Sequence, residues 1–323
     1  MTSGLPFDDI RNLIADLPAM DKAAAARVHA NLATDKQELG RLREIGEWLA
    51  AVTGRAPARV ARPVVALFAA THAVSQRIGV NDPVREAQAR VEAIAAGAAP
   101  ISQLCASGNL GLNVFDLALE LPVGDFSAGP ALEERAAAAT MAFGMEAIAA
   151  GPDLICLGTV DRAGELSAAA LLCAVLGQKV SAWAEAGRDG QAVIQQALGL
   201  HQNHLSEPLE AMRRLGGREI AALAGAILAA RAQKIAVILD GLAATAAAAV
   251  LRALNQNALE HCLLAAAESE AHREAAGLIG LQPVLSLDGL KSGGVAGALA
   301  ANVVRGAGEV SVGMADVSAR LRA

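Results

Sequence analysis

The chain has 323 residues, enough for one large α/β domain or for a core domain with a smaller partner. Its formal charge is −6 and its pI is near 5.6. Nucleic acid is therefore not an expected partner, because phosphates attract a basic face with stacking aromatics and only 2% of the residues are aromatic. We also expect no membrane span, because the most apolar window, 220–230, has about half the required length.

The chain begins MTSGLPFDDIRNLI, which lacks the basic-then-apolar order of a signal peptide. We therefore expect a cytoplasmic protein. Its four cysteines, Cys105, Cys156, Cys173 and Cys262, stand singly in apolar segments without CxxC spacing. In a protein that is not exported, such cysteines are typical small buried hydrophobic residues, with a metal site or a disulfide as the alternative.

In chain order, the first 60 residues have helical patterns without a strand. Short apolar runs then alternate with helical patterns such as 130–150 and 218–230, whose apolar spacing is near 3.6. The expected strands are 64–68, 112–117, 154–158, 235–239, 262–265 and 283–287. The long connection from 158 to 234 must hold several helices, including 190–204 and 208–215.

This alternation predicts a fold class. Strands joined by crossover helices are typical of a parallel sheet covered on both faces. We therefore predict an α/β, Rossmann-like fold with a mostly parallel six-stranded sheet. Residues 61–307 should form a large domain with the ligand pocket, and residues 1–60 and 308–323 should form a small helical lobe from both chain ends.

Candidate site residues follow from this prediction, because ligands of an open parallel sheet bind beyond the carboxyl ends of its strands. The residues at these ends are Thr71, His72, Gly158, Thr159, Asp240, Glu270, Ser292, Gly293 and Gly294. His72 is either a hydrogen-bonded structural residue or an acid or base. Asp240 either orients a ligand hydroxyl or caps the helix that follows it.

Three other patterns have simpler interpretations. The stretch LDGLKSGGVAGALAANVV falls one residue short of GxGxxG, and close packing of a helix on a strand explains its glycines better than dinucleotide binding. His201 and His204 lack a third ligand, so we expect no metal. Glu219 should lie in the first turn of its helix, where the dipole favours a negative charge, rather than act as a buried carboxylate.

Long segments resemble the nicotinate-nucleotide:dimethylbenzimidazole phosphoribosyltransferases of α-proteobacteria over nearly the whole length. They include LGRLREIGEWLAAVTGRAPA, LGLNVFDLALELPVGDF, PLEAMRRLGGREIAALAGAILAARAQK and VILDGLAATAAAAVL. The resemblance implies a homodimeric enzyme of cobalamin biosynthesis, without metal or cofactor. Such enzymes transfer the phosphoribosyl group of nicotinate mononucleotide to 5,6-dimethylbenzimidazole, which gives the lower ligand as α-ribazole phosphate.

Several family motifs are altered in this chain. K-P-P-G-[SA]-L-G falls on 34–40, where the closing Leu-Gly remains. G-E-M-G-I-G-N-T-T falls on 158–166, which reads GTVDRAGEL. G-x-G-T-G and a downstream lysine, both associated with the phosphate, fall on 181–186, which reads SAWAEA with no lysine in the following helix. Glycines that let a backbone approach a phosphate are mostly lost.

The family motifs around the base are altered too. The acid or amide before His-Gly-Val falls on Thr71, and H-x-S-x-E keeps Glu270 with Glu268 at the serine position. L-G-E-G-T-G falls on 291–296. Its glutamate, the family's general base, corresponds to Gly293, so the resemblance assigns no catalytic residue here.

We therefore expect a family member that is impaired or inactive in the standard reaction, a pseudoenzyme in the extreme case, since a positioned base contributes about 10²–10⁴-fold. The pocket would still take small molecules, the aromatic base and weakly nicotinate mononucleotide. One alternative is a non-catalytic binding or regulatory subunit, as a homodimer or as a heterodimer with an active family member. Another is an enzyme of altered chemistry that uses Asp161, Arg162, Glu165 or Glu268.

Overall fold

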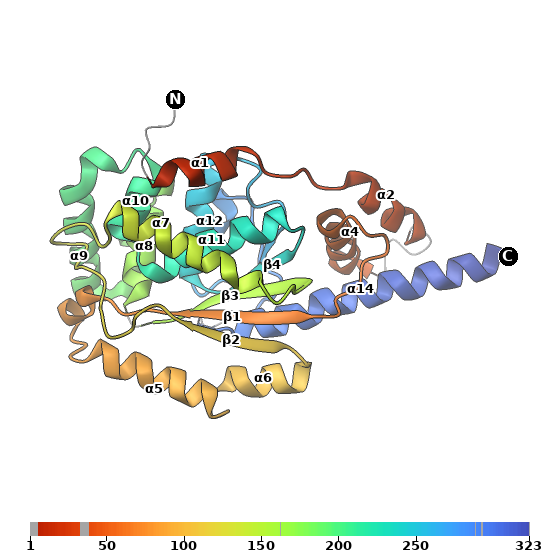
Figure 1. The fold of residues 1–323 in the computed structure, drawn as a ribbon, viewed down its shortest axis with the longest axis horizontal. Coiled ribbons are helices and arrows are strands. Elements are labelled where there is room, and N and C mark those ends of the chain that lie inside the picture. The colour runs from red at the N-terminus through yellow and green to blue at the C-terminus, as the bar shows by residue number, and fades with distance from the viewer. Residues whose placement is uncertain (1–5, 33–38, 162, 288, 292, 323) are drawn as a thin grey trace.

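The computed structural model describes residues 6–32, 39–161, 163–287, 289–291 and 293–322. Its centre is a parallel sheet of five strands in the order β2-β1-β3-β4-β5 (Figure 1). The strands are β1 Pro63–Ala69, β2 Gly111–Asp116, β3 Leu154–Val160, β4 Ala236–Leu239 and β5 Cys262–Leu264. The predicted α/β fold with a parallel sheet is confirmed, and each of these strands overlaps a predicted one.

The predicted sixth strand, 283–287, is wrong. The N–H groups of Val284 and Leu285 do donate to the carbonyls of Leu264 and Ala265, both at 2.8 Å. Pro283 adds an isolated bridge to Leu264, but it has no N–H to give to a ladder. The segment therefore follows β5 for a short distance without forming a strand.

Helices cover both faces of the sheet (Figure 1). One face carries α7 Glu134–Met145, α8 Gly164–Leu176, α9 Gly187–His201, α10 Pro208–Leu215, α11 Arg218–Ala232 and α12 Leu242–Leu254. The other carries α5 Pro83–Ala95, α6 Pro100–Gly108 and the first part of α14 Val295–Arg322. The sheet and the helices on its two faces form the large body of the molecule, which also contains α13 Glu270–Leu278. The short 3-10 helices are η2 Ala73–Ile78, η3 Glu146–Ile148, η4 Val180–Ala182, η5 Ala184–Ala186 and η6 Gln202–His204.

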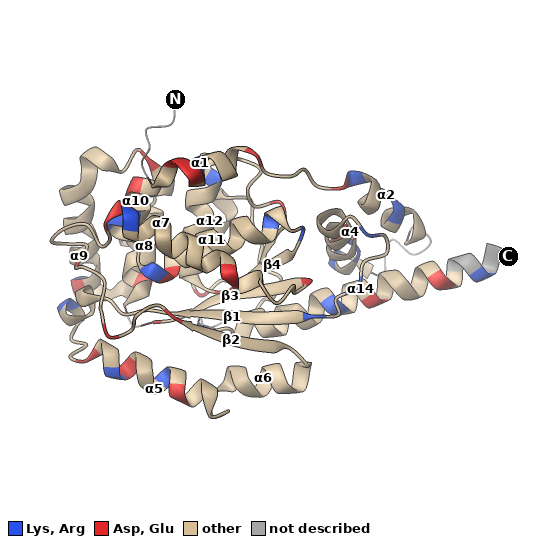
Figure 2. Cartoon of the chain, viewed as in Figure 1, with Lys and Arg blue, Asp and Glu red and all other residues tan. Residues whose placement is uncertain are grey.

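The sheet separates two hydrophobic cores, because neighbouring residues of a strand point to opposite faces. Phe68 and Leu157 contribute to the core under α7–α12, whereas Leu67 and Cys156 contribute to the core under α5, α6 and α14. Asp116 at the end of β2 is the one charged residue within the five described strands, and Figure 2 shows charged residues on the surrounding helices and loops.

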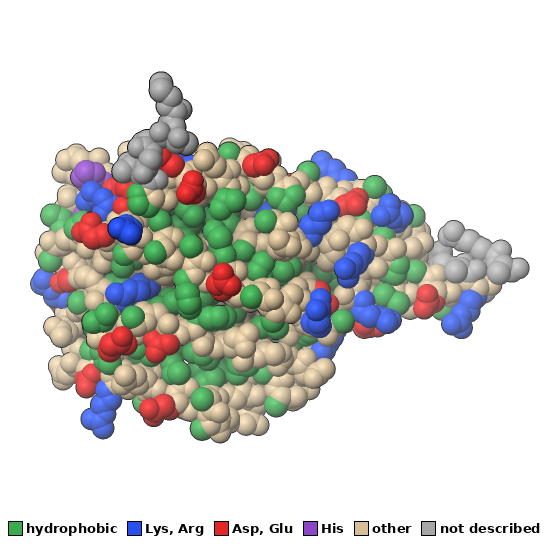
Figure 3. Space-filling view, viewed as in Figure 1, with side chains coloured by type: hydrophobic (Ala, Val, Ile, Leu, Met, Phe, Trp, Pro, Cys, Tyr) green, Lys and Arg blue, Asp and Glu red, His purple; other side chains and the backbone are tan. Residues whose placement is uncertain are grey.

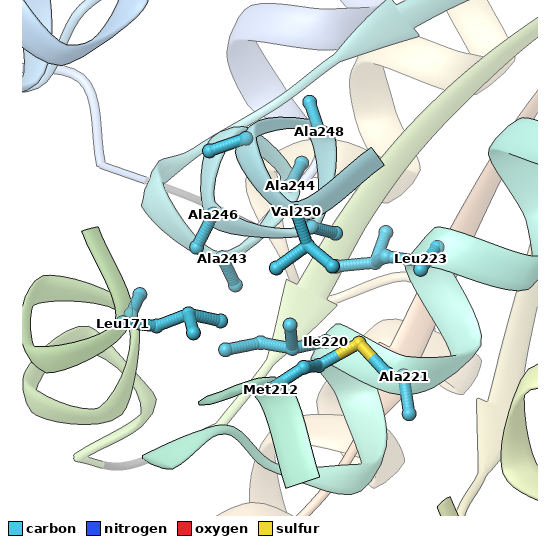
Figure 4. Packing of buried hydrophobic residues seen from close by; sticks show 14 of the residues in the cluster. Leu171, Met212, Ile220, Ala221, Leu223, Ala243, Ala244, Ala246, Ala248 and Val250 are labelled. Atoms are coloured by element: carbon cyan, nitrogen blue, oxygen red, sulfur yellow. The ribbon is translucent and has the colours of Figure 1, made fainter. Parts of the chain in front are cut away.

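The larger core is rich in alanine, which lets helix backbones approach closely (Figure 4). The contact between α7 and α11 is the tightest example. A Cβ atom on Gly144 would lie 2.0 Å from the carbonyl oxygen of Ala222, and one on Gly225 would lie 1.9 Å from that of Met141. The two glycines are therefore required by the crossing itself.

Both chain ends contribute to a separate helical layer. α2 Lys22–Asn31 and α4 Arg41–Thr53 pack together and against α14, which runs from beneath the sheet to the C-terminus (Figure 1). α1 Phe7–Ala15 instead packs on α7 and α12 of the large body. The indole N–H of Trp48 donates to the carbonyl of Glu260 at 2.9 Å and ties α4 to the large body. Among the described residues, no helix has both the length and the apolar character to cross a membrane.

Candidate functional site

A cavity of about 390 Å³ opens at the carboxyl ends of the strands. Its walls come from residues after β1, β3, β4 and β5, and from the segment around η5. This is the edge at which an open parallel sheet binds its ligands. The cavity is the candidate functional site.

The cavity wall carries more acidic than basic residues. Among its described lining residues, Asp161, Glu165, Glu185 and Glu268 are acidic, and Arg90 and Lys291 are basic. Only Lys291 is paired with an acid, whereas Arg90 binds a neutral carbonyl. The Arg90 guanidinium donates to the carbonyl of Asp161 at 2.9 Å, and the Lys291 ammonium lies 3.8 Å from the Glu165 carboxylate. The electrostatic character of the wall therefore disfavours an anion.

Asp161 follows the last residue of β3 and begins the turn into α8. Its Oδ1 accepts a hydrogen bond from the N–H of Gly164 at 3.0 Å. A Cβ atom at position 164 would lie 2.4 Å from this oxygen, so the glycine leaves room for the carboxylate in this position. Burial raises the pKa of Asp161, nearby Glu219 raises it further, and His72 lowers it. A proton-binding group is thus fixed at the cavity wall.

Behind this carboxylate lies a buried ion pair. The imidazole Nε2 of His72 lies 3.1 Å from Oε1 of Glu219, and both side chains are fully buried. Burial alone would lower the pKa of His72, but the Glu219 carboxylate, with help from Asp161, raises it above the ordinary value. A Cβ atom at Gly217 would lie within 2.4 Å of both side chains, so this glycine makes room for the pair.

The prediction for Glu219 was therefore half correct. Glu219 does lie in the first turn of α11, but it is also a buried carboxylate, which the sequence pattern had argued against. α11 is buried on almost all sides, and the helix N-terminus together with His72 compensates the negative charge.

Trp183 and His272 complete the polar wall of the cavity. Trp183 is 1% exposed. Among the described residues, no acceptor lies within hydrogen-bond distance and angle of its indole N–H. The Cys173 thiol, a weak acceptor, lies beside it. His272 accepts from the N–H of Glu268 at 3.1 Å through Nδ1 and bonds Thr245 at 2.8 Å through Nε2. Burial lowers the pKa of His272 to about 4, so it is neutral.

The predicted site residues lie behind or beside the cavity. Thr71 is buried and donates to the carbonyl of Leu119 at 2.8 Å, and Thr159 is buried within β3 next to Asp161. Glu270 begins α13 with its side chain 87% exposed and near Arg273. Ser292 lies outside the described residues. The described predicted residues are thus close to the cavity without being among its lining residues.

The remaining predicted residues lie where the ends of β3 and β4 meet the turn before α14. Oδ2 of Asp240 accepts from the N–H of Gly297 at 3.0 Å, so Asp240 caps α14 rather than the helix that follows it. Burial raises the pKa of Asp240 to about 6. A Cβ atom on Gly158 would lie 3.1 Å from Leu67 and 3.5 Å from the nitrogen of Gly294. Gly293 and Gly294 have φ values of 117° and 86°, which favour glycine.

Three residues that line the cavity, Asp161, Glu165 and Glu268, were named from the sequence for an altered chemistry. Arg162, named with them, lies outside the described residues. Trp183, Glu185 and His272 were missed, because 181–186 was interpreted as a lost phosphate loop and the helix of His272 was given no role. Among the described residues, no group of three or more His, Cys, Asp or Glu side chains could hold a metal ion.

The fold and cavity define a class of protein, an α/β protein with a cavity at the carboxyl edge of a parallel sheet. Comparisons with known proteins define the family. Residues 15–320 match the family described as phosphoribosyltransferase. The chain belongs to this family.

Several relatives are named nicotinate-nucleotide–dimethylbenzimidazole phosphoribosyltransferase. One from Rhizobium rhizogenes is 49% identical over 326 residues, which cover 97% of this chain and 96% of that protein. One from Agrobacterium fabrum is 48% identical over 330 residues, which cover 98% and 95%. The crystal structure of the phosphoribosyltransferase of this name from Thermus thermophilus has a TM-score of 0.82 and 27% identity, covering 90% of this chain and 96% of that one. The family resemblance read from the sequence is confirmed.

Proposed function

We propose that this chain acts in the synthesis of the lower ligand of cobalamin as a phosphoribosyltransferase family member that binds 5,6-dimethylbenzimidazole and transfers the phosphoribosyl group slowly or not at all. The observation that carries this proposal is the charge of the cavity. Its described walls hold four carboxylates and two cations, and one of the cations, Lys291, is paired with Glu165.

The charge of the wall opposes the nucleotide more than the base. A nucleotide phosphate carries about −1.5 to −2 charges at neutral pH. Each carboxylate near it would repel it by about 4 kcal/mol per pair of unit charges at 4 Å with an effective dielectric constant of about 20. A neutral heteroaromatic ring experiences no such repulsion and gains from contact with apolar wall residues such as Leu166 and Leu242.

The position of the family's general base supports the same proposal. Gly293 has no side chain to accept a proton, and its φ of 117° is one that L residues rarely adopt. A positioned base contributes about 10²–10⁴-fold to rate. Weak nucleotide binding also removes the alignment of the two reactants, which contributes about 7–11 kcal/mol in favourable cases. Together these losses leave little turnover.

The proposal includes a homodimer and a cytoplasmic location. Leu121 and Phe143 are 58% and 44% exposed, and Figure 3 shows hydrophobic side chains along the face that carries α7. Isologous dimers are the commonest closed oligomers. The four cysteines are free and buried, which suits a reducing compartment. Sedimentation at micromolar concentration tests the assembly, and a monomer of 32.7 kDa would contradict it.

Isothermal titration calorimetry tests the ligand assignment. We expect saturable binding of 5,6-dimethylbenzimidazole and at least about tenfold weaker binding of nicotinate mononucleotide, because the repulsion above exceeds the roughly 1.4 kcal/mol of one tenfold step. Raising the salt concentration should reduce this difference by screening the wall. Tight binding of the nucleotide at low salt, or no binding of the base, would contradict the proposal.

A further inference from the structure

Asp161 occupies a position that the proposed function leaves without a role. Where the family pattern has a glycine, this chain places a carboxylate at the end of β3 and on the cavity wall. The turn holds the carboxylate in place, because the N–H of Gly164 binds Oδ1 and glycine at 164 leaves room for the carboxylate in this position. A loop residue that points into solvent would not need this hydrogen bond.

The surroundings of Asp161 set the charge that a ligand meets. The buried His72–Glu219 pair lies behind it, and its two opposite charges nearly cancel. The guanidinium of Arg90 binds the Asp161 carbonyl, which leaves the carboxylate itself without an arginine partner in the described residues. The acid therefore presents a hydrogen-bond acceptor to the cavity.

Trp183 provides an independent sign of a ligand. It is almost fully buried, it lines the same cavity, and its indole N–H lacks an oxygen or nitrogen acceptor among the described residues. A buried indole N–H normally finds an acceptor. A planar ligand that carries both a ring N–H and an acceptor nitrogen matches an acid and an indole N–H on one cavity wall.

We infer that Asp161 is the specificity-determining residue of this cavity: its carboxylate accepts a hydrogen bond from a ring N–H, and it selects planar heteroaromatic bases with a free N–H over N-alkylated bases. This inference rests on the proposed function, since it assumes that the cavity takes the aromatic base. It goes further by naming the residue that reads the base and the chemical group that is read.

Other ligand classes fit the wall less well. A phosphate meets the carboxylates described above, and a divalent cation meets no cluster of three or more ligating side chains among the described residues. A purely apolar ring would leave the indole N–H of Trp183 without a strong acceptor, which costs about 1–3 kcal/mol, and it would give Asp161 no donor beyond those of the protein, such as the N–H of Gly164. The N–H heteroaromatic ring is the class that satisfies both.

Two probes that differ by one methyl group test the inference, namely benzimidazole and 1-methylbenzimidazole. Calorimetry on the full chain should show benzimidazole binding at least about tenfold more tightly, the effect of one hydrogen bond to a charged group. Asp161→Asn should remove most of this preference, since a neutral acceptor bonds about half as strongly as a carboxylate. Asp161→Ala should remove it entirely.

Asp9→Asn is the matched control, because it makes the same charge change at an exposed position of α1. It should leave the preference unchanged, and circular dichroism should show that all variants are folded. Equal binding of the two probes by the unmodified chain would overturn the inference while leaving the proposed function intact. A preference that survives in Asp161→Ala would overturn it as well. Failure of both probes and of 5,6-dimethylbenzimidazole to bind would overturn the proposed function and, with it, this inference.

Discussion

The helix-packed core and the cavity at the carboxyl edge of the sheet show opposite behaviour. In the core, backbone touches backbone, and a single methyl group on Gly144 or Gly225 would overlap a carbonyl of the facing helix. At the cavity, Asp161, Glu165, Glu185 and Glu268 line a space that is open to a ligand. Positions that contact the protein itself are constrained by folding, whereas positions that contact a ligand are constrained by function.

The comparison explains how this chain can keep the fold of its relatives while its cavity wall carries four acidic residues. Residues 15–320 match the family, and the crystal structure from Thermus thermophilus superimposes with a TM-score of 0.82. The charged residues of the cavity wall lie on other elements than the tight contact between α7 and α11. Substitutions in the core, at the cavity and between them can locate the boundary of the two regions.

The largest expected effect belongs to the core. Gly225→Ala should destabilise the protein by at least about 4 kcal/mol, because its Cβ would lie 1.9 Å from the carbonyl oxygen of Met141 and neither helix backbone can move freely. Urea denaturation measures this change. Gly199→Ala in α9 is the control, since nothing lies within 4 Å of its Cβ, and it should be neutral or stabilising by up to about 1 kcal/mol. Equal effects of the two changes would remove the argument for tight packing.

The buried pair lies on the boundary between core and cavity. His72→Ala should cost about 3 kcal/mol or more, because it leaves the Glu219 carboxylate buried without its cation. The double change of His72→Ala and Glu219→Ala should cost less than the sum of the single changes. Denaturation of the four proteins measures the coupling. Additive costs would show that the two side chains act independently.

The titration of Asp240 gives a smaller effect with a definite sign. Its pKa is raised to about 6 in the folded chain from an ordinary value of 3.8, so the folded state binds more protons between these values. The stability of the wild type therefore falls as pH rises through this window, whereas Asp240→Asn does not titrate. From about pH 4 to about pH 7 the variant should gain about 2 kcal/mol relative to the wild type. Thermal unfolding of both proteins across this pH range checks the prediction. A stability difference that does not change with pH would contradict a raised pKa of the buried Asp240.

Sequence reasoning predicted the sheet because apolar runs of strand length alternate with helical patterns. It predicted one strand too many. The apolar pattern at 283–287 favours a strand, but Pro283 has no N–H to donate and joins β5 only through an isolated bridge. Sequence reasoning also underestimated Glu219. A helix that is apolar all round, such as α11, signals burial, but the partner His72 is 147 positions away in the chain and is brought near only by folding.

The site was predicted less completely than the fold. The rule for parallel sheets is topological and indicates their carboxyl edge, and a cavity does lie at that edge. Which side chains point into the cavity depends on packing across long distances, as with Asp240, which caps α14 through Gly297. Trp183 was not predicted as a site residue, because the segment 181–186 was compared only with the family's phosphate motif.

The smallest expected effect concerns the base position. Gly293→Glu adds a carboxylate where space is open, but its φ of 117° strains any residue other than glycine. We expect binding of 5,6-dimethylbenzimidazole to change by less than about tenfold and turnover to stay near background, because the nucleotide is still neither held nor aligned. Calorimetry and an assay of nicotinate release check both parts. Full activity from this single change would show that the nucleotide site is functional.

Nicotinate release by the unmodified chain tests the central claim most directly. Purified protein given nicotinate mononucleotide and 5,6-dimethylbenzimidazole should release nicotinate at least about 100-fold more slowly than the Rhizobium rhizogenes relative assayed beside it, because the family resemblance puts Gly293 at the position of the general base. A rate within about tenfold of that relative would contradict the account and would show that another residue, with Glu268 or Glu270 the first to mutate, supplies the base.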